Sequence, residues 1–397
     1  MRPPELLVPA SLVDVDELIA DPDPEGAPMA DGPCPALLEL LHQAVAAQAS
    51  DVHLVPGYAP TLRVHGALQP VGSHPLEPED VRAMVASIVP DRGRSQLDDS
   101  ADLDCSVTVL HDGASYRFRV NAFLSQGRWC ACLRHIPNEI PSLEWLGFPR
   151  SLAERLVSHV NGLVVLTGVT GSGKSASLAA LIHLLRQDGR KRILTVEEPI
   201  EYVHAPGAGG IVTQREVGRD VESFADGLKY GLRQDPDVIL VGEIRDRETA
   251  QMALSAAETG HLIFTTLHTR DAKGAITRLV DLFPQEAQDD IRKQIAMSLR
   301  SVVCQHLLPA AEPGAQRVLA LEVLHVTPAV QAAIRAGKVE QLESALQTGR
   351  RDGMIALDDD LQRLLSQGRI TLETARRFAK DPAAFGGGGN GTVVRME

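Results

Sequence analysis

Residues 162–175 read GLVVLTGVTGSGKS, an apolar run that passes directly into a glycine-rich loop. The run Leu163–Thr167 predicts a buried strand, and Ser175–Gln187 predicts the helix that follows the loop. Between them, GVTGSGKS matches the pattern GxxxxGK followed by Ser or Thr at every fixed position. Small residues let successive backbone N–H groups point into one concavity, where a polyphosphate can lie on the N-terminus of the helix.

We therefore expect this loop to bind ATP together with Mg²⁺. Lys174 is placed to reach the β- and γ-phosphates, and the hydroxyl of Ser175 is placed to ligate Mg²⁺. The alternative is a glycine turn around a buried lysine stem, which the strand, loop and helix in this order disfavour. The predicted nucleotide-binding residues are Gly168, Val169, Thr170, Gly171, Ser172, Gly173, Lys174 and Ser175.

Apolar strands alternate with helices in the sequence that begins at this loop. The predicted strands are GLVVLTG, RILTVEEP, DVILVGE and HLIFTTLH, and the predicted helices are KSASLAALIHLLRQ, DGLKYGLRQ and ETAQMALSAAETG. This alternation is typical of a parallel sheet covered by helices on both faces, so the predicted fold class is α/β. From about Arg270 to Lys380 we expect a mainly helical region.

Acidic side chains follow two of the predicted strands. The apolar run Val238–Val241 leads into Glu243, and TVEEPIEYV carries Glu197, Glu198 and Glu201. Because ligands bind beyond the carboxyl ends of parallel strands, these carboxylates should converge on the nucleotide. Hydrolysis needs one group for the Mg²⁺ shell and one to orient or deprotonate water, which suits Glu243 and Glu201. The alternative, a Glu that caps the next helix, fits Glu197 or Glu198.

His261 and His268 stand at the two ends of the predicted strand HLIFTTLH. A strand of this length spans about 20 Å, so the two rings cannot chelate one metal within it. One histidine could report on the γ-phosphate and the other on a neighbouring element. The plainer interpretation is a pair of hydrogen-bonded histidines at the strand ends.

A separate α+β domain is predicted before the ATP-binding region. The segment ALLELLHQAVAAQ predicts an amphipathic helix, and alternating runs such as SDVHLVPG and YRFRVNAFL predict strands. Arg117 and Arg119 alternate with aromatic residues and share one strand face, while Arg134 lies on another strand. They form either a solvated polar face or an arginine cluster directed at a phosphate.

The composition excludes several classes of protein. The chain has 397 residues, 44% of them hydrophobic and 23% charged, which suits a globular protein of two or three domains. Its net charge of −13 disfavours nucleic acid as a partner. We find no membrane-spanning run and no signal peptide, and the 5 cysteines form no CxxC pair, so we expect a cytoplasmic protein without a disulfide framework or a four-cysteine zinc site.

Several motifs in one order resemble the secretion ATPases of the type II/IV superfamily, and most closely the type IV pilus retraction ATPases. The motifs are ASDVHLVPG, RFRVNAF, LRHIP, GVTGSGKS, ILTVEEPIEYV, QREVGRD, DPDVILVGEIRD, AAETGHLIFTTLHT and SALQTGRRDGMIALDDDL. The resemblance covers the chain from about Ala49 to Phe385. It implies a PAS-like N-terminal domain hinged to a RecA-like P-loop ATPase core with a helical C-terminal region.

The same resemblance implies a homo-hexameric ring with the nucleotide between the two domains of each subunit. Such a ring works at the inner face of the inner membrane on a pilus platform protein, and it touches the membrane only through that platform. The domain layout becomes a disordered extension at 1–34, a PAS-like domain at 35–135, a hinge linker at 136–150, an ATPase domain at 151–385 and a flexible tail at 386–397.

Roles also follow from the resemblance, position by position. Glu201 matches the last Glu of the family's acidic box, which is the expected general base, and Glu243 matches the Walker B Glu. His261 and His268 match the paired histidines of the His box. The family's arginine-rich strands, which face the nucleotide, correspond to Arg117, Arg119 and Arg134.

The sequence departs from the family pattern in four places. Val169 replaces the usual Pro, Ala176 replaces a common Thr, and Glu198 replaces an Asp of the acidic box. The fourth is the signature AIRNLIRE of retraction enzymes, which reads AVQAAIRA at residues 329–336, with Gln331 in place of the first Arg and Ala336 in place of the Glu.

Three other functions therefore stay open beside a retraction motor. One is an accessory paralogue of that motor, and another is a nucleotide-gated regulatory ring that hydrolyses ATP poorly. The third is a related DNA-transfer ATPase, for which the charge of −13 supplies no basic footprint. The family's extension and type II secretion branches carry a four-cysteine zinc insertion, which this sequence lacks.

Overall fold

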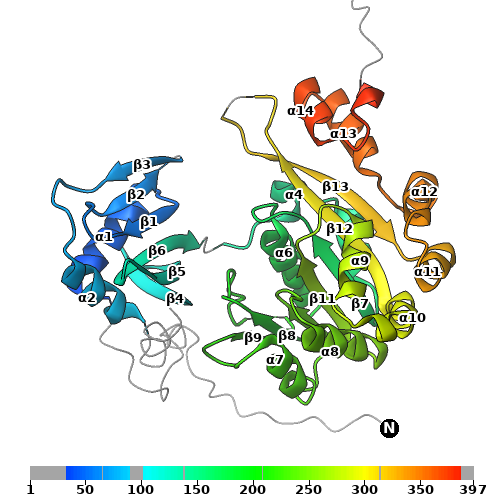
Figure 1. Cartoon of the computed structure of the whole chain (residues 1–397), viewed down its shortest axis with the longest axis horizontal. Coiled ribbons are helices and arrows are strands. Elements are labelled where there is room, and N and C mark those ends of the chain that lie inside the picture. Colours follow the sequence, from blue (N-terminus) through cyan, green and yellow to red (C-terminus); the bar gives the residue numbers. More distant parts are fainter. Residues whose placement is uncertain are drawn as a thin grey trace, which may run out of the picture. The chain divides into compact units, whose positions relative to one another are not determined.

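A computed structural model describes residues 33–64, 66–89, 102–136, 139–207, 209–312 and 314–385 (Figure 1). The predicted tail at 386–397 and all but two residues of the predicted extension at 1–34 lie outside these ranges. The chain divides into two compact units. One comprises Met1–Leu103 and Val120–Arg134, and the other comprises Asp104–Arg119 and His135–Glu397.

The N-terminal sheet has six strands in the order β3-β2-β1-β6-β5-β4. The predicted helix forms as α1, whose buried residues Leu37, Leu40, Leu41 and Ala44 recur at helical spacing. β2 and β3 pair as antiparallel strands. The elements are α1 (Pro35–Ala46), β1 (Asp51–Leu54), β2 (Thr61–Val64), β3 (Ala67–Pro70), α2 (Pro78–Ile88), β4 (Asp102–His111), β5 (Ala114–Ser125) and β6 (Arg128–Ile136).

The Pro-rich segment predicted as a hinge at 136–150 is only partly a linker. Its second half forms the short helix α4 (Leu143–Leu146), which Ser142 caps at the N-terminus and Gly147 ends in a left-handed conformation. Leu143 and Phe148 are buried in the same apolar cluster as the helix after the phosphate loop. Burial of these two side chains therefore makes this half of the segment part of the second core.

The second sheet has seven strands in the order β13-β12-β7-β11-β10-β8-β9. The six strands from β12 to β9 in this order run parallel, and β13 is antiparallel to β12. The parallel α/β prediction is thus confirmed. The strands are β7 (Gly162–Thr167), β8 (Arg192–Glu197), β9 (Ile211–Glu216), β10 (Val238–Val241), β11 (Leu262–Leu267), β12 (Leu299–Leu308) and β13 (Val318–His325).

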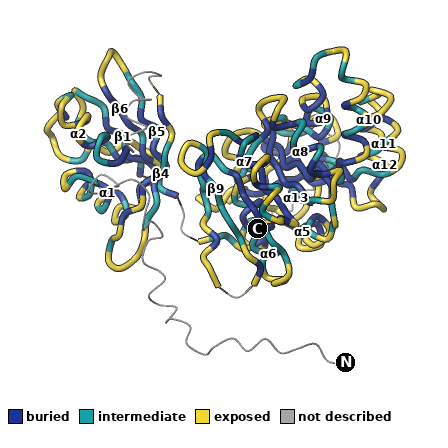
Figure 2. The backbone as a smooth tube through the Cα atoms, turned by 90° about the horizontal axis from the view of Figure 1, so that it is seen from below, coloured by how far each residue is buried: buried dark blue, intermediate teal, exposed yellow. Residues whose placement is uncertain are grey.

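Helices cover both faces of this sheet. Leu163 and Val165 of β7 pack with α7 to α12 on one face, whereas Val164 and Leu166 pack with α4 to α6 on the other. Buried residues accordingly gather along the strands, and exposed residues follow the connections (Figure 2). The helices are α5 (Arg150–Val157), α6 (Lys174–Gln187), α7 (Phe224–Gly231), α8 (Arg247–Glu258), α9 (Ala272–Asp281), α10 (Gln288–Ser298), α11 (Pro328–Arg335) and α12 (Gln341–Thr348).

The expectation of a mainly helical region from Arg270 to Lys380 is wrong in its centre, where β12 and β13 form a strand pair. The residues of β13 are all buried, and a fully buried strand has no alternation that separates it from a buried helix. After this pair the chain is helical, with α13 packing on β13. The last helices are α13 (Leu357–Ser366) and α14 (Leu372–Phe378), with short 3₁₀ turns at η2 (Gln285–Ala287), η3 (Gly349–Asp352) and η4 (Pro382–Phe385).

A buried ion pair joins the end of the described chain to the sheet. Glu322 of β13 is 1% exposed, and its carboxylate accepts a hydrogen bond from the backbone N–H of Ala272 at 2.9 Å. The ammonium of Lys380 lies 2.5 Å from the other carboxylate oxygen of Glu322. Two segments far apart in sequence, the start of α9 and the residues after α14, therefore meet at one carboxylate.

None of the helices in the described part of the chain combines the length and apolar character that crossing a bilayer requires.

Candidate nucleotide-binding site

The phosphate loop connects β7 to α6 with three glycines at positive φ. Gly168, Gly171 and Gly173 have φ values of 146°, 78° and 90°. At Gly168 a Cβ atom would lie 2.5 Å from the carbonyl oxygen of Gln305 and 2.5 Å from the hydroxyl of Ser172. Both the conformation and the close packing therefore require glycine at this first position of the motif.

The loop offers unsatisfied polar groups at the N-terminus of α6. The cap residue Gly173 provides no side-chain hydrogen bond to the first turn of α6, so its leading N–H groups stay available to an anion. Among the described residues, the buried hydroxyl of Ser172 has no hydrogen-bond partner. Val169, Thr170 and Ser175 are exposed. A glycine cradle, a buried polar atom without a partner and open helix N–H groups together fit a phosphate chain.

Lys174 is folded back over the loop. Its ammonium donates hydrogen bonds to the carbonyl oxygens of Gly168 at 2.8 Å and Val169 at 3.2 Å, and the residue is 8% exposed. Burial lowers the pKa of Lys174, while the negative charges of Glu243 and Glu201 act in the opposite direction. A largely desolvated cation whose hydrogen bonds within the described residues go to carbonyl oxygens gains from an anionic ligand.

Glu243 follows β10 and contacts two basic side chains. One of its carboxylate oxygens lies 3.2 Å from Nε2 of His268, which follows β11, and the other pairs with the guanidinium of Arg245. Arg245 also donates to Glu198 at 2.9 Å. The structure thus brings Glu243 and His268 together, as their positions after adjacent parallel strands suggest. The contact between Arg245 and Glu243 was not predicted, although the position of Arg245 two residues after Glu243 indicates it.

Capping residues fix where the helices after these strands begin. The side chain of Asp246 accepts the backbone N–H of Thr249 at 2.8 Å and starts α8. The side chain of Asp271 accepts the N–H of Gly274 at 2.6 Å and starts α9. The N-termini of α6, α8 and α9 therefore all lie at the carboxyl edge of the sheet, where their dipoles favour negative charge.

The acidic segment after β8 holds a carboxyl group with a strongly shifted pKa. Burial raises the pKa of Glu197 from 4.5 to about 7, and the nearby charge of Glu201 acts in the same direction. Hydrogen bonds from Thr195 at 2.7 Å and Gln214 at 3.1 Å partly offset this shift. Glu201 is partly buried, and its charge influences Glu197 and Lys174, so it belongs to the same electrostatic cluster.

The structure does not bring His261 to this cluster. The residue precedes β11, at the amino edge of the sheet, and its Nδ1 lies 3.1 Å from the carbonyl oxygen of Ala256. The hydroxyl of Thr259 lies 3.5 Å from the same nitrogen. Of the two predicted histidines, only His268 stands near the carboxylate of Glu243.

The three predicted arginines are each engaged with acidic or carbonyl groups. Nε of Arg119 lies 3.4 Å from a carboxylate oxygen of Asp104. Nε of Arg134 donates to the buried carboxylate of Asp51 at 2.8 Å. Arg117 donates to the carbonyl oxygen of Ile200 at 2.9 Å and lies 3.9 Å from Glu216. Burial lowers the pKa of Arg117, and the carboxylates of Glu216 and Glu197 oppose this shift.

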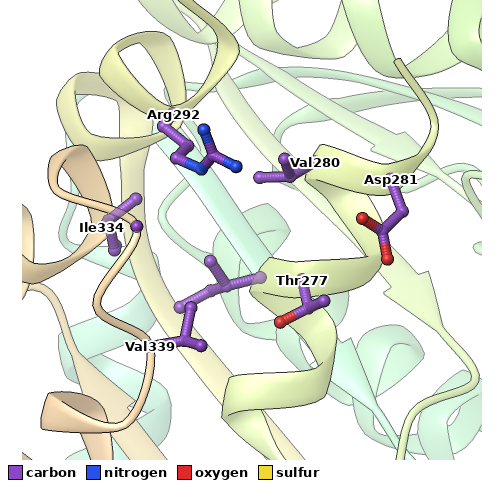
Figure 3. A pocket seen from close by; sticks show the side chains of 8 residues that line it. Thr277, Val280, Asp281, Arg292, Ile334 and Val339 are labelled. Carbon is purple, nitrogen blue, oxygen red and sulfur yellow. The ribbon is translucent and has the colours of Figure 1, made fainter. Parts of the chain in front are cut away.

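A small pocket lies elsewhere, between α9, α10 and α11 (Figure 3). Its volume is about 120 Å³, and it is lined by Ile276, Thr277, Val280, Asp281, Arg292, Ile334, Gly337 and Val339. None of these residues belongs to the phosphate loop or to the carboxylates around it. Ile334, however, comes from the 329–336 segment whose sequence departs from the retraction signature.

A phosphate loop after a buried parallel strand, with a carboxylate at the end of a neighbouring strand, defines the class of P-loop NTPases. Residues 30–388 match the family of type II/IV secretion system proteins. The chain belongs to this family, and it is an ATPase.

Named relatives and solved structures refine this position. The type IV pilus retractation ATPase PilT of Pseudomonas aeruginosa is 43% identical over 349 residues, covering 88% of this chain and 99% of that protein. The type IV pilus ATPase PilU of the same organism is 38% identical, covering 86% and 88%.

Two solved structures resemble the chain over most of its length. The crystal structure of the pilus retraction motor PilT with bound ADP has 41% identity and a TM-score of 0.78, and the match covers 87% of this chain and 98% of that one. The ATPase DotB of Legionella pneumophila has 30% identity and a TM-score of 0.76, covering 88% and 97%.

Proposed function

We propose that this ATPase powers the retraction of type IV pili, and with it twitching motility. The observation that carries the proposal is the joint presence of a complete phosphate loop, with Lys174 desolvated over it, and the Glu243–His268 pair at the next strand ends. The similarity to PilT over 88% of this chain supports the proposal that the ATPase acts on a type IV pilus. In this proposal the chain assembles as a homo-hexamer at the cytoplasmic face of the inner membrane and acts on a pilus platform protein.

The residues around the loop divide the work of binding. The N–H groups at the start of α6 and the ammonium of Lys174 bind the β- and γ-phosphates of ATP. Ser175 and Glu243 would hold Mg²⁺, and both offer oxygen, the donor atom that this ion prefers. When bound, Mg²⁺ supplies positive charge that neutralises the phosphate oxygens.

The other predicted residues are proposed to act in proton transfer, in sensing the state of the site and in stabilising charge. Glu201 is proposed to accept the proton of the attacking water, because its charge lies in the same cluster as Lys174. His268 contacts Glu243 and can report to the rest of β11 whether the carboxylate is engaged. Arg117, Arg119 and Arg134 are proposed to stabilise phosphate charge, which would require each to leave its present partner.

Glu243→Gln tests the chemistry. Because the substitution keeps the shape and removes the charge, we expect ATP turnover to fall by about 100-fold or more while ATP still binds. Phosphate release and nucleotide affinity measured on the purified chain check this, and light scattering checks the ring. Turnover equal to that of the wild type would contradict the proposed chemistry.

A strain that lacks the chain tests the direction of work. A retraction motor predicts hyperpiliated and non-motile cells, whereas loss of pili would identify an extension motor. Normal piliation with weakened motility would favour the second candidate, an accessory paralogue of the retraction motor. The likeness to PilU and the changes at Gln331 and Ala336 are the observations that favour it.

A further inference from the structure

Two side chains of β9 reach back to the acidic segment that follows β8. β9 is the edge strand of the seven-stranded sheet and pairs in parallel with β8 (Figure 1). Gln214 and Glu216 are two positions apart on β9, so they lie on the same face of the strand. Both belong to the motif QREVGRD, which has no role in the binding of nucleotide by the phosphate loop.

Gln214 makes three hydrogen bonds with the acidic segment. Its amide nitrogen donates to the carbonyl oxygen of Tyr202 at 2.9 Å and to the carboxylate of Glu197 at 3.1 Å. Its amide oxygen accepts the backbone N–H of His204 at 2.7 Å. One side chain therefore holds the segment at its start and at two later peptide groups.

Glu216 adds a fourth anchor one residue before Glu201. Its carboxylate accepts the backbone N–H of Ile200 at 3.1 Å, and the residue is 5% exposed. The backbone N–H of Glu216 is itself held by Asp220 at 2.7 Å, within the same motif. The side chain of Glu216 is thus buried, and its backbone is fixed by the hydrogen bond to Asp220.

Together these bonds bracket Glu201 on both sides. Residues 200, 202 and 204 are tied to β9, so the peptide groups that flank Glu201 have little freedom to turn. A general base has to stand within hydrogen-bond reach of the water that it deprotonates, and a misplacement of about 1 Å can lower a rate by about 100-fold.

We propose that Gln214 and Glu216 are positioning residues that fix the segment carrying Glu201 for ATP hydrolysis. The inference rests on the proposed function, because it takes Glu201 as the general base. It assigns a role to the QREVGRD motif, whose Gln supplies a donor and an acceptor on one side chain and whose Glu supplies an acceptor alone. Neither side chain needs to touch the nucleotide.

Gln214→Leu in the full chain is the main test. It keeps the volume of the side chain and removes all three hydrogen bonds. We expect kcat to fall by about tenfold or more with the KM for ATP nearly unchanged, because the phosphate loop is intact. Hydrogen exchange should accelerate at the backbone N–H of His204, which loses its acceptor, but not in β7. The exchange of β7 also serves as the control for folding.

Thr213→Val is the matched control, since Thr213 precedes Gln214 on β9 and its side chain lies on the opposite face. It should leave kcat and the exchange at His204 as in the wild type. Glu216→Gln retains an acceptor for the N–H of Ile200 and should preserve most of the turnover, whereas Glu216→Ala should not. The contrast between these two variants separates positioning from general loss of stability.

Wild-type kcat together with wild-type exchange at His204 in Gln214→Leu would overturn the inference. A fall in ATP affinity equal to the fall in kcat would also overturn it, because it would place the effect on binding. If the wild-type chain itself failed to hydrolyse ATP, the proposed function would fall, and exchange at His204 would still decide whether the anchors hold the segment.

Discussion

The two edges of the seven-stranded sheet carry similar residue types in different states. At the carboxyl edge, Lys174, Glu243 and His268 lie among helix N-termini, and the lysine is desolvated over backbone carbonyls. At the amino edge, the guanidinium of Arg300 donates to the backbone and side-chain oxygens of Asn161 at 3.1 and 2.9 Å and to the carbonyl of Met297 at 2.7 Å.

The two edges differ in whether their charged groups are available to bind a ligand. At the amino edge, backbone and side-chain oxygens satisfy the guanidinium of Arg300, so this charge stabilises the fold and is not left free for a ligand. At the carboxyl edge, the desolvated ammonium of Lys174 and the N-termini of three helices favour a bound phosphate. Charge alone therefore does not mark the site in this sheet. The state of hydrogen bonding around the charge does.

The largest effect is expected from Lys174→Ala compared with Arg300→Ala. The first removes the cation of the phosphate loop, so turnover should drop by about 1,000-fold. The second should lower the free energy of unfolding by about 1 to 3 kcal/mol, through lost hydrogen bonds, with turnover of the folded protein unchanged. Phosphate release and thermal unfolding measure both, and an equal loss of turnover in the two variants would refute the contrast.

A smaller effect is expected from the two histidines of β11. His268→Ala removes a contact that positions Glu243 and should lower turnover by about 100-fold, the loss expected when a reacting group is misplaced by about 1 Å. His261→Ala acts at the opposite edge and should leave the affinity for ATP unchanged. Titration with nucleotide and steady-state turnover of both variants provide the check. Loss of ATP affinity in His261→Ala would bring that histidine back into the nucleotide site.

The smallest effect is a pH dependence of stability that comes from Glu197. Because burial raises its pKa to about 7, the folded chain holds this proton more tightly than the unfolded chain does. The contribution to stability is present below about pH 4.5 and is lost as the pH rises through about 7. Glu197→Gln should therefore flatten the fall in melting temperature between about pH 5 and pH 8.

Thr213→Val provides the control for that titration, because it changes no ionisable group. It should leave the dependence of the melting temperature on pH as in the wild type over the same range. An unchanged slope in Glu197→Gln would mean that Glu197 is not the group that titrates there.

The sequence predicts the centre of the site well because its signals are local. The loop Gly168–Ser175 carries its geometry in consecutive residues, and Glu243 and His268 each follow a buried strand directly. Parallel pairing then brings these strand ends together, which is a rule of topology rather than of particular side chains.

What the sequence does not predict depends on contacts between distant segments. Gln214 and Glu216 acquire their partners only when β8 and β9 are aligned, and no pattern in the neighbouring residues predicts these contacts. β13 was missed because a fully buried strand has no periodicity to distinguish it from a helix. The opposite placement of His261 shows that two residues of one motif can serve different edges.

The buried pair of Glu322 and Lys380 sets a limit on where the chain can be shortened. Lys380 lies after the last long helix, in a stretch that looks dispensable, yet it neutralises a carboxylate that is 1% exposed and that holds the first turn of α9. Cutting the chain before this lysine would leave a buried charge without its counterion, at about 3 to 5 kcal/mol. In an engineered version, the boundary of the ATPase core therefore has to lie beyond Lys380, because electrostatics rather than secondary structure marks its end.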